Sequence, residues 1–476
     1  MQDDKANNSV EKDKATNLQI SNPPSQDVNI ELRYPQKDRG LKAWLFLIGA
    51  WFPFAYGVFR EYFFSHQPFQ GATIVSTGGL LANGVLQICV PFIIYILNNF
   101  PHQRKNAMWL GCVICSVSPI SAAFTNSPSV LVVLLGPLYG IGAGLLFAPS
   151  MHFMDDWFLE RKSFAYGIIC GAGAGSGAAL SPVYAISLEK YGYKPTLVAM
   201  GLITLVVTAG GLVLMNPRTP AEKAPKPTRR DFDFLRKPLF LVFLAATVVQ
   251  SSSNYGPTVY LPSIGADFGL SNTQGALLVS LQNLAQAIGQ PLQGALAVST
   301  PSDTSASFYA PLVLSTLGGS ASCLLIWPFA RQLWSLVIFS LVFGALVPGF
   351  AVLRPRFAAA VIGKDRKVAT QGDVDISEAT VEEEEAETET ETETEAARQR
   401  NKSLLIFGIL TAARGIAIVA ASFVSVALVH EESADLSGYG LGTKWRNLII
   451  YTGVTMAVAS LGAIGKFIPF DAKIGQ

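Results

Sequence analysis

Charged residues are scarce in this sequence. Only 14% of its 476 residues are Asp, Glu, Lys or Arg and 50% are hydrophobic, whereas an ordinary soluble domain carries about 25% charged residues. The formal net charge of +1 gives no electrostatic reason to expect a nucleic acid or an acidic partner. The composition therefore argues against a soluble protein and predicts no nucleic-acid partner.

Cysteine and histidine are scarce as well. The five cysteines all fall within apolar runs. The pair Cys112-x-x-Cys115 has no further Cys or His beside it, so we expect buried thiols rather than disulfides or a metal or redox site. The four histidines all lie near the ends of apolar runs: His66, His102, His152 and His430. We therefore predict no metal, no cofactor and no catalytic residue, and keep a membrane enzyme only as an alternative.

Long apolar runs are abundant. A helix that crosses a hydrocarbon core of roughly 30 Å needs about 20 mostly apolar residues, and about twelve runs reach that length. The predicted spans of the first half are 43–64, 71–97, 107–125, 129–153, 163–188 and 194–215. Those of the second half are 237–260, 273–298, 308–330, 332–354, 403–429 and 445–467. The end at 354 is the least defined, because the apolar stretch Phe357–Ile362 continues beyond Arg354 and Arg356. The predicted fold class is an all-α polytopic membrane protein.

Polar segments divide the chain into regions. The predicted regions are a disordered cytoplasmic tail at 1–42, an N-terminal bundle at 43–215, a cytoplasmic linker at 216–236, a C-terminal bundle at 237–467 and a cytoplasmic tail at 468–476. A polar insert interrupts the second bundle at 363–402. Its acidic tract at 378–395 concentrates like charges that repel one another and stay solvated, so we expect the insert to be disordered. Regulation through phosphorylated threonines is the alternative.

The basic residues predict the orientation. Lys and Arg concentrate in alternate connections, including the linker and the insert, and basic connections face the cytoplasm. Both termini and both long polar segments are therefore expected to be cytoplasmic, although connection 299–307 has no basic residue and gives no support. We expect the plasma membrane as the location of this integral membrane protein, with the vacuolar membrane as the alternative.

A row of glutamines marks the predicted eighth span. Gln282, Gln286, Gln290 and Gln293 recur at intervals of four, four and three, which places them on one face of a helix. Amides that face lipid would be left unpaired, so this face must look inward. Two uses stay open, namely lining of a central cavity, for which Gln286 and Gln290 are the candidates, and hydrogen bonding between helices.

Two further groups of polar residues lie within predicted spans. The run from Gln250 to Tyr255 precedes Gly256-Pro257 in the seventh span, and a break in a membrane helix is tolerated only where protein or water satisfies the freed backbone groups. Asn254 and Tyr255 are therefore candidate binding residues. Asn83 and Gln87 form a similar i, i+4 pair in the second span, and we include both in the candidate site.

Arg414 is the most informative single residue. It lies about eleven residues into the span that begins near Ser403, or roughly 16 Å deep at 1.5 Å per residue. A guanidinium at that depth must face the interior and find a carboxylate, a carbonyl or an anionic ligand. No acid lies at the same depth in any predicted span. We predict that Arg414 contacts the substrate, with a purely structural pair as the alternative.

The glycine-rich run Gly171–Gly177 invites comparison with a phosphate-binding loop. It lies inside an apolar span and no lysine follows it, unlike the loop of nucleotide-binding proteins. Small residues at this spacing instead allow two helices to approach closely. We therefore predict helix packing here and no nucleotide.

Several short motifs are grouped between Leu138 and Pro195. They are Trp157-Phe158, Arg161-Lys162, Ala165-x-Gly167 and Gly175-Ser176. This grouping resembles the fourth-to-fifth-span signature of the monocarboxylate porter family of the major facilitator superfamily, and Tyr260–Gly294 is similar to the following spans of fungal members. The resemblance implies the major-facilitator fold, with 12 transmembrane helices in two six-helix bundles. It also implies a cytoplasmic gate that includes Asp156, Arg161 and Lys162.

The sequence departs from the family pattern at three places. Arg39–Trp44 lacks the acid that opens the first span in the family, and Asn98–Lys105 lacks the usual Asp of the loop that follows the second span. An Asp and an Arg precede the proline of the eighth span in lactate and pyruvate carriers. Counted from Pro291, the matching residues here are Gln286 and Gln290. Proton-coupled carriage of a simple monocarboxylate is therefore not the first choice.

These observations predict a secondary active transporter of a small organic molecule, neutral or weakly acidic, that works by alternating access. Its partners are the substrate and the lipid bilayer, and proton coupling stays open. We favour efflux of a fungal secondary metabolite. The alternatives are proton-coupled uptake of a monocarboxylate or of a riboflavin-like nutrient, and a non-transporting membrane sensor that signals through 363–402.

Overall fold

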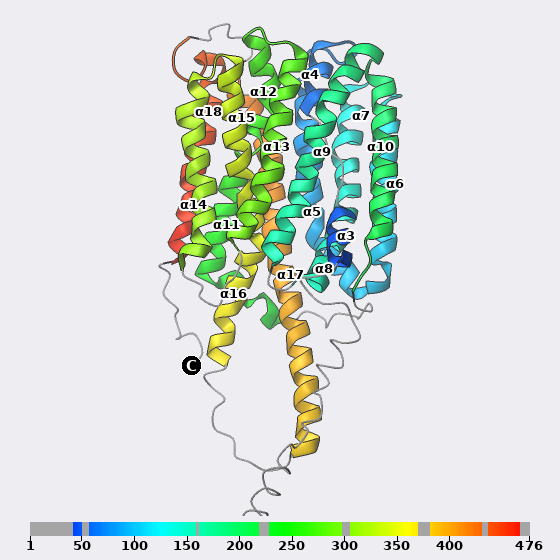
Figure 1. The fold of residues 1–476 in the computed structure, drawn as a ribbon, viewed down its shortest axis with the longest axis vertical. Helices are drawn as coiled ribbons and strands as arrows, with labels where there is room; N and C mark the ends of the chain where they lie inside the picture. Colours follow the sequence, from blue (N-terminus) through cyan, green and yellow to red (C-terminus); the bar gives the residue numbers. More distant parts are fainter. Residues whose placement is uncertain are drawn as a thin grey trace, which may run out of the picture.

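Helices make up the described structure. The computed structural model describes residues 41–49, 57–158, 161–218, 228–297, 305–369, 381–430 and 437–466, and these contain no β-strand. The helices run side by side along the long axis of the molecule in two groups (Figure 1). The predicted all-α class is confirmed.

The first group holds the helices of the N-terminal half. Its elements are α3 (Leu41–Gly49), α4 (Gly57–Ser65), η1 (Thr73–Thr77), α5 (Gly78–Asn99), η2 (Pro101–Gln103), α6 (Arg104–Ala122), α7 (Pro128–Val133), η3 (Leu134–Leu138), α8 (Tyr139–Trp157), α9 (Lys162–Tyr191) and α10 (Tyr193–Leu214). Residues 50–56, in the middle of the first predicted span, lie outside the described residues. Pro137 lies in η3, where a short π-helical turn joins α7 to α8.

The second group holds the helices of the C-terminal half. Its elements are η4 (Arg229–Arg236), α11 (Pro238–Ser251), α12 (Gly256–Asp267), α13 (Asn272–Leu296), α14 (Ser305–Ala321), η5 (Ser322–Ile326), η6 (Trp327–Phe329), α15 (Leu333–Leu346), η7 (Val347–Leu353), α16 (Arg354–Ala369), α17 (Val381–Leu428), α18 (Gly442–Ala459) and η8 (Ser460–Lys466). The predicted break in the seventh span is present between α11 and α12, where the polar run precedes Gly256-Pro257.

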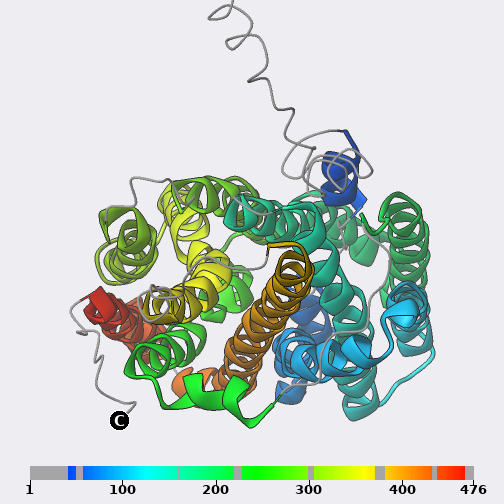
Figure 2. The ribbon, with the colours of Figure 1, turned by 90° about the horizontal axis from the view of Figure 1, so that it is seen from below.

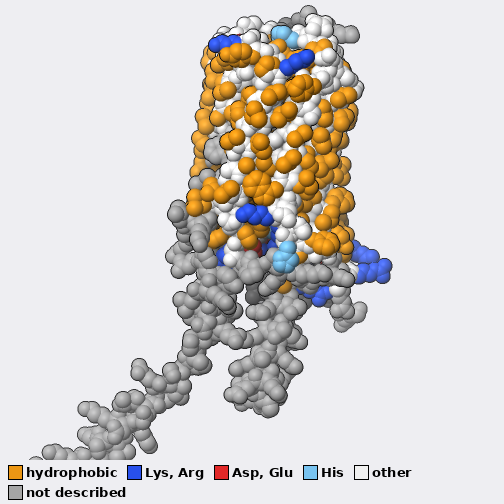
Figure 3. All heavy atoms as spheres, turned by 90° about the vertical axis from the view of Figure 1, so that its right-hand side faces the viewer, with side chains coloured by type: hydrophobic (Ala, Val, Ile, Leu, Met, Phe, Trp, Pro, Cys, Tyr) orange, Lys and Arg blue, Asp and Glu red, His pale blue; other side chains and the backbone are white. Residues whose placement is uncertain are grey.

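The surface of the bundle matches a lipid environment. Among the described residues, eight helical segments are long and apolar enough to cross a membrane. Large apolar side chains point outward, such as Phe92 at 65% and Val206 at 71% exposure. Figure 3 shows such side chains covering the middle of one face, with Lys and Arg toward its ends. The chain is therefore an integral membrane protein, and the count of twelve spans stays a prediction.

The polar insert differs from the expectation of disorder. α16 continues to Ala369, and α17 already begins at Val381, within the acidic tract; residues 370–380 lie outside the described residues. Glu, Ala and Arg favour helix, and a helix that is already nucleated in a membrane span propagates at little cost. Figure 1 shows both helices extending beyond the same end of the bundle, which we call the extension side.

Deletion of Val381–Glu395 should leave membrane insertion and basal transport nearly unchanged. The segment is the part of α17 that extends beyond the bundle (Figure 1), and its like charges contribute little to a packed core. Surface abundance and transport of the deletion variant, measured beside the full chain, provide the test. Loss of insertion or of all activity would show that the segment is structural.

The two groups meet most closely along α9 and α13. A Cβ at Gly167 of α9 would lie 2.7 Å from the backbone oxygen of Gln290, and one at Gly171 would lie 2.8 Å from that of Ala287. A Cβ at Gly294 of α13 would overlap the carbonyl group of Ser163. These glycines let the backbones of the two helices touch. Of the glycine-rich run, Gly171 has the predicted packing role, whereas a Cβ at Gly173 would meet nothing within 4 Å. Seen from below, α17 also lies between the two groups (Figure 2).

Candidate functional site

A central cavity of about 300 Å³ lies between the two groups of helices. Its walls include α5, α8 and α9 of the first group and α12, α13, α16 and α17 of the second. Both groups contribute polar side chains, among them Asn83 and Tyr166 from the first and Thr258 and Asn283 from the second. A largely apolar cavity with a few polar groups offers hydrogen bonds that orient a solute.

The structure brings all seven predicted substrate-binding residues to this central cavity. They are Asn83, Gln87, Asn254, Tyr255, Gln286, Gln290 and Arg414. Gln87 donates a hydrogen bond of 2.7 Å to the side-chain oxygen of Asn83, one helical turn away. Asn254 and Tyr255 lie in the gap between α11 and α12. Their common location is a structural fact, whereas substrate binding by them stays a prediction.

The glutamine row of α13 serves both of the uses that the sequence left open. Gln286 and Gln290 line the central cavity. Gln282 donates to the hydroxyl of Thr258 at 2.7 Å, and the amide of Gln293 donates to two backbone oxygens, those of Ala345 and Leu346, at 2.8 and 2.7 Å. The two ends of the row therefore fasten α13 to its neighbours. Gln290 lines the cavity and also donates to the backbone oxygen of Pro348 at 3.2 Å, and Gln286 lines the cavity.

Neutral groups hold the guanidinium of Arg414. Its hydrogen bonds within the described structure go to Gln250 Oε1 at 3.0 Å, to Ser251 Oγ at 3.2 Å and to the hydroxyl of Tyr255 at 3.3 Å. The ring of Tyr255 lies 5.7 Å from the guanidinium carbon, close enough for a cation–π contact. The side chain is 2% exposed. Arg414 is thus solvated by protein dipoles while its charge is not neutralised by any of them.

Arg354 is a cavity residue that the sequence prediction missed. It was expected at the end of the tenth span, yet it is 4% exposed and lines the central cavity. It donates to Gln87 Oε1 at 3.2 Å, to Thr411 Oγ1 at 2.8 Å and to the hydroxyl of Tyr166 at 2.5 Å. The tenth span runs on through η7 and α16 to Ile362. The apolar stretch after Arg354 was the signal that could have placed it inside.

The central cavity is electropositive. Neither Asp nor Glu occurs among its described lining residues, whereas Arg354 and Arg414 both line it. The undescribed segment 50–56 holds no acid in its sequence. An arginine at the centre of a membrane helix costs roughly 2.5–3.5 kcal/mol on insertion scales, and such residues usually mark the path of an ion or substrate. Two of them around one cavity suit an anionic ligand.

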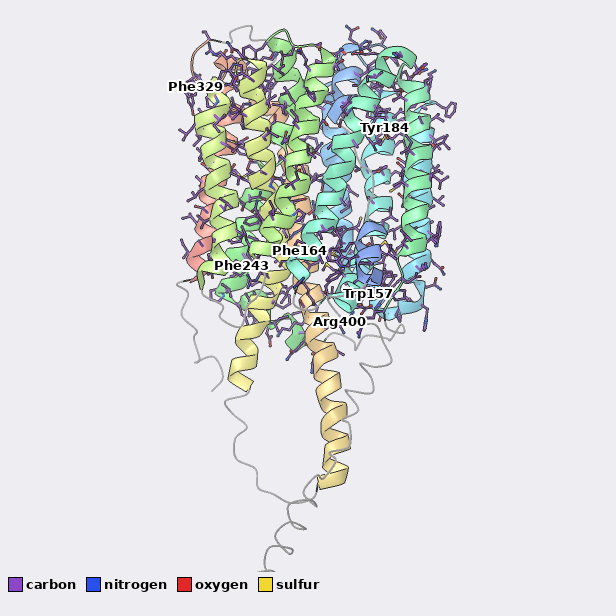
Figure 4. All side chains as sticks on the ribbon, viewed as in Figure 1. Trp157, Phe164, Tyr184, Phe243, Phe329 and Arg400 are labelled. Atoms are coloured by element: carbon purple, nitrogen blue, oxygen red, sulfur yellow. The ribbon has the colours of Figure 1, made fainter. Side chains whose placement is uncertain are left out.

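An ion pair joins the two groups on the extension side of the cavity. Arg400 of α17 pairs with the carboxylate of Asp156 on α8 and donates to the backbone oxygen of His152 at 3.3 Å. Figure 4 shows Arg400 at this end of the bundle, beside Trp157. Of the predicted gate residues, Asp156 thus bonds across the two groups. Lys162 pairs within its own group, with Asp155 at 3.0 Å, and Arg161 is exposed.

The same end of α17 also contacts the linker. Arg398 donates to Asp231 Oδ1 at 3.1 Å, and the backbone N–H of Thr228 donates to Asp231 Oδ2 at 2.6 Å. Burial acts to raise the pKa of Asp231, but the hydrogen bonds from Thr228 and Arg398 outweigh it, so the pKa lies below its ordinary value. Asp231 therefore stays charged, and α17 contacts both the linker and α8.

A second contact joins the two groups on the side opposite to the extensions. Arg60 of α4 donates to Ser76 Oγ at 3.1 Å and to the hydroxyl of Ser263 on α12. Its guanidinium carbon lies 4.7 Å from the ring centre of Tyr260. The sequence suggested no role for Arg60, because its position near a span end is where arginines commonly reach the interface. Bonds between the groups therefore lie on both sides of the central cavity.

The fold and the cavity define a class of protein. Two groups of membrane helices that enclose a cavity with polar groups in its wall, with bonds between them on either side of it, are the architecture of a membrane transporter. The family model described as the Major Facilitator Superfamily matches residues 46–365. The chain belongs to the Major Facilitator Superfamily.

Its relatives are named as transporters. It is 24% identical over 320 residues to "Monocarboxylate transporter 12" of Xenopus laevis, an alignment that covers 60% of this chain and 67% of the relative. It is 26% identical over 275 residues to "MFS-type transporter pynF" of Aspergillus niger, which covers 55% of this chain and 62% of the relative. The matched region thus spans about two thirds of the length of each relative. The resemblance to monocarboxylate transporters found in the motifs is confirmed.

Solved structures show the same fold. The nucleoside transporter NupG superposes with a TM-score of 0.57 at 12% sequence identity, covering 90% of this chain and 97% of that protein. A mutant form of the same transporter gives a TM-score of 0.59 at 11% identity, covering 90% of this chain and 98% of that protein. At such identities the likeness concerns the fold alone.

Proposed function

We propose that this protein is a secondary active transporter that carries a small organic anion across the membrane by alternating access. The observation that carries the proposal is the guanidinium of Arg414, which lines the central cavity and is held only by neutral groups of the described structure. An anionic substrate supplies the charge that these groups do not. Gln286, Gln290 and Asn254 then offer amide contacts to its uncharged part.

The contacts on the two sides of the cavity are suited to act as alternating gates. The ion pair of Asp156 with Arg400 lies on the extension side, and the contact of Arg60 with Ser263 lies on the other. Rocking of one bundle against the other breaks one contact while the other holds. Because the basic connections predict a cytoplasmic extension side, we assign the pair Asp156–Arg400 to the cytoplasmic gate.

Efflux of a metabolite is our proposal for the direction, on the resemblance of Tyr260–Gly294 to fungal members. Proton-coupled uptake of a monocarboxylate is the second candidate, and the names of the vertebrate relatives favour it. The amides Gln286 and Gln290 count against it, because they stand where those carriers use a charged pair. The described lining of the cavity also offers no carboxylate that could carry a proton.

Uptake and efflux of labelled solutes test this function. The panel contains organic anions and neutral analogues of similar size, and cells with the protein are compared with cells that lack it. We expect the protein to accelerate flux of at least one organic anion and to leave the neutral analogues unchanged. Acceleration of neutral solutes alone would contradict the role proposed for Arg414.

A further inference from the structure

The two arginines of the central cavity both contact α17, Arg414 as a residue of that helix and Arg354 of α16 through a hydrogen bond to it. Arg354 donates to Thr411 of α17 at 2.8 Å, and Arg414 lies three residues further along the same helix. At 1.5 Å per residue this separates the two attachment points by about 4.5 Å along the axis. Both side chains line the cavity and both are at least 96% buried. The cavity thus holds two buried positive charges, held at residues of α17 that are three apart.

The partners of these arginines leave some of their N–H donors unused. Arg354 makes hydrogen bonds to Ala351, Gln87, Thr411 and Tyr166, and Arg414 makes three, all of them to neutral acceptors. A guanidinium has five N–H donors, so neither side chain has used all of its donors. A carboxylate binds a guanidinium through shorter and stronger hydrogen bonds than a neutral oxygen does. Arg354 therefore has one N–H donor left and Arg414 has two, so each can offer a carboxylate a hydrogen bond in addition to its charge.

We propose that the central cavity selects a doubly charged organic anion, with one carboxylate at Arg354 and the other at Arg414. This inference rests on the proposed function and narrows its substrate class to dicarboxylates. A single carboxylate shared by both arginines would leave one excess positive charge in a site of low dielectric, where an unpaired charge is costly. A dianion balances both charges.

The position of Arg354 also connects such a substrate to both bundles. Its hydrogen bonds reach Gln87 on α5 and Tyr166 on α9, both in the first group. Those of Arg414 reach Gln250 and Ser251 on α11 and Tyr255 just beyond it, all in the second group. A dianion that binds both arginines therefore lies at the boundary between the groups, where alternating access requires the substrate to be.

The experiment compares dicarboxylates with analogues that carry one charge fewer. Purified full-length protein in liposomes is assayed for exchange of labelled succinate, glutarate and adipate at neutral pH. The matched competitor is the mono-amide of each acid, which has the same length and a single negative charge. We expect each favoured dicarboxylate to exchange, and to compete, at least tenfold better than its mono-amide.

Two variants test whether Arg354 and Arg414 cause the preference for dicarboxylates over mono-amides. Arg354→Gln and Arg414→Gln should each lower dicarboxylate exchange at least tenfold and mono-amide exchange by a smaller factor, so that the preference for the dianion is lost. Arg331→Gln is the matched control, because Arg331 is exposed, is not among the residues that line the central cavity, and bonds to the backbone oxygen of Gly438. It should behave as the unchanged protein.

The outcomes separate this inference from the function on which it rests. Equal or better exchange of the mono-amides by the unchanged protein overturns the two-charge inference, and leaves a transporter of organic anions in place. If neither the dicarboxylates nor the mono-amides exchange, with normal amounts of protein in the liposomes, both the two-charge inference and the proposed function are overturned. The comparison within the unchanged protein does not depend on any variant folding correctly.

Discussion

Arg414→Gln should insert into the membrane normally and yet transport an anionic substrate at least tenfold more slowly. Glutamine keeps a hydrogen-bonding amide within reach of Gln250, Ser251 and Tyr255, the present neutral partners of Arg414, but it removes the charge. Hydrogen bonds to charged groups contribute about 1.5–3 kcal/mol, which corresponds to a loss of tenfold or more. Initial transport rate divided by surface abundance is the measurement.

Arg414→Lys distinguishes the contribution of the charge from that of the guanidinium shape. Lysine restores the charge but lacks the planar fork that binds a carboxylate through two parallel bonds. We expect it to recover only part of the lost transport. Normal transport by the glutamine variant at normal surface abundance would remove the substrate contact and leave Arg414 as a structural residue.

Gly294→Val should lower transport at least tenfold by holding the two bundles apart on the extension side. A Cβ at residue 294 would overlap the carbonyl group of Ser163. The same Cβ would lie 3.1 Å from the Cα of Phe164. These are backbone atoms of α9, so no side chain can move aside. The cavity residue Cys170 should then react faster with a membrane-impermeant thiol reagent applied from the extension side.

Gly210→Val is the matched control. Gly210 lies in α10, where an added Cβ meets nothing within 4 Å, and the cost of valine within a helix is similar at both sites. Transport and labelling of Cys170 should be unchanged in this variant. Equal losses in the two variants would show that the effect comes from helix stability rather than from separation of the bundles.

The sequence was sufficient to predict the polar lining of the cavity, for a physical reason. A buried amide or guanidinium in a membrane span must face protein or water, so Gln286, Asn254 and Arg414 had to point inward. Their spacing along each helix located a face, and inward faces of a bundle meet at its centre. The structure places them there, and the assignment of substrate binding to them stays a proposal.

The location of Arg354 in the cavity was not predicted, because the tenth span was expected to end at its first charged residue. An arginine at the end of a span reaches the interface, whereas one followed by more apolar residues does not. The stretch Phe357–Ile362 carries the span past Arg354 and buries Phe357 completely. A charged residue that is followed by more apolar residues is therefore expected to lie within the membrane span rather than at its end.

Contacts between distant parts of the chain were beyond prediction from one sequence. Asp156 and Arg400 are 244 residues apart, and no local pattern links them. Arg60 and Ser263 are 203 residues apart and belong to different bundles. The helix that begins at Val381 was also missed, because charge repulsion was weighed without the support of the membrane helix that follows it.

Exchange of labelled organic anions by purified protein in liposomes tests the central claim most directly, with Arg414→Gln assayed in parallel and protein-free liposomes as the blank. The account predicts accumulation of at least one labelled anion with the unchanged protein, at least tenfold less with Arg414→Gln, and none in the blank. Equal accumulation by the two proteins, or accumulation of neutral solutes alone, would contradict it.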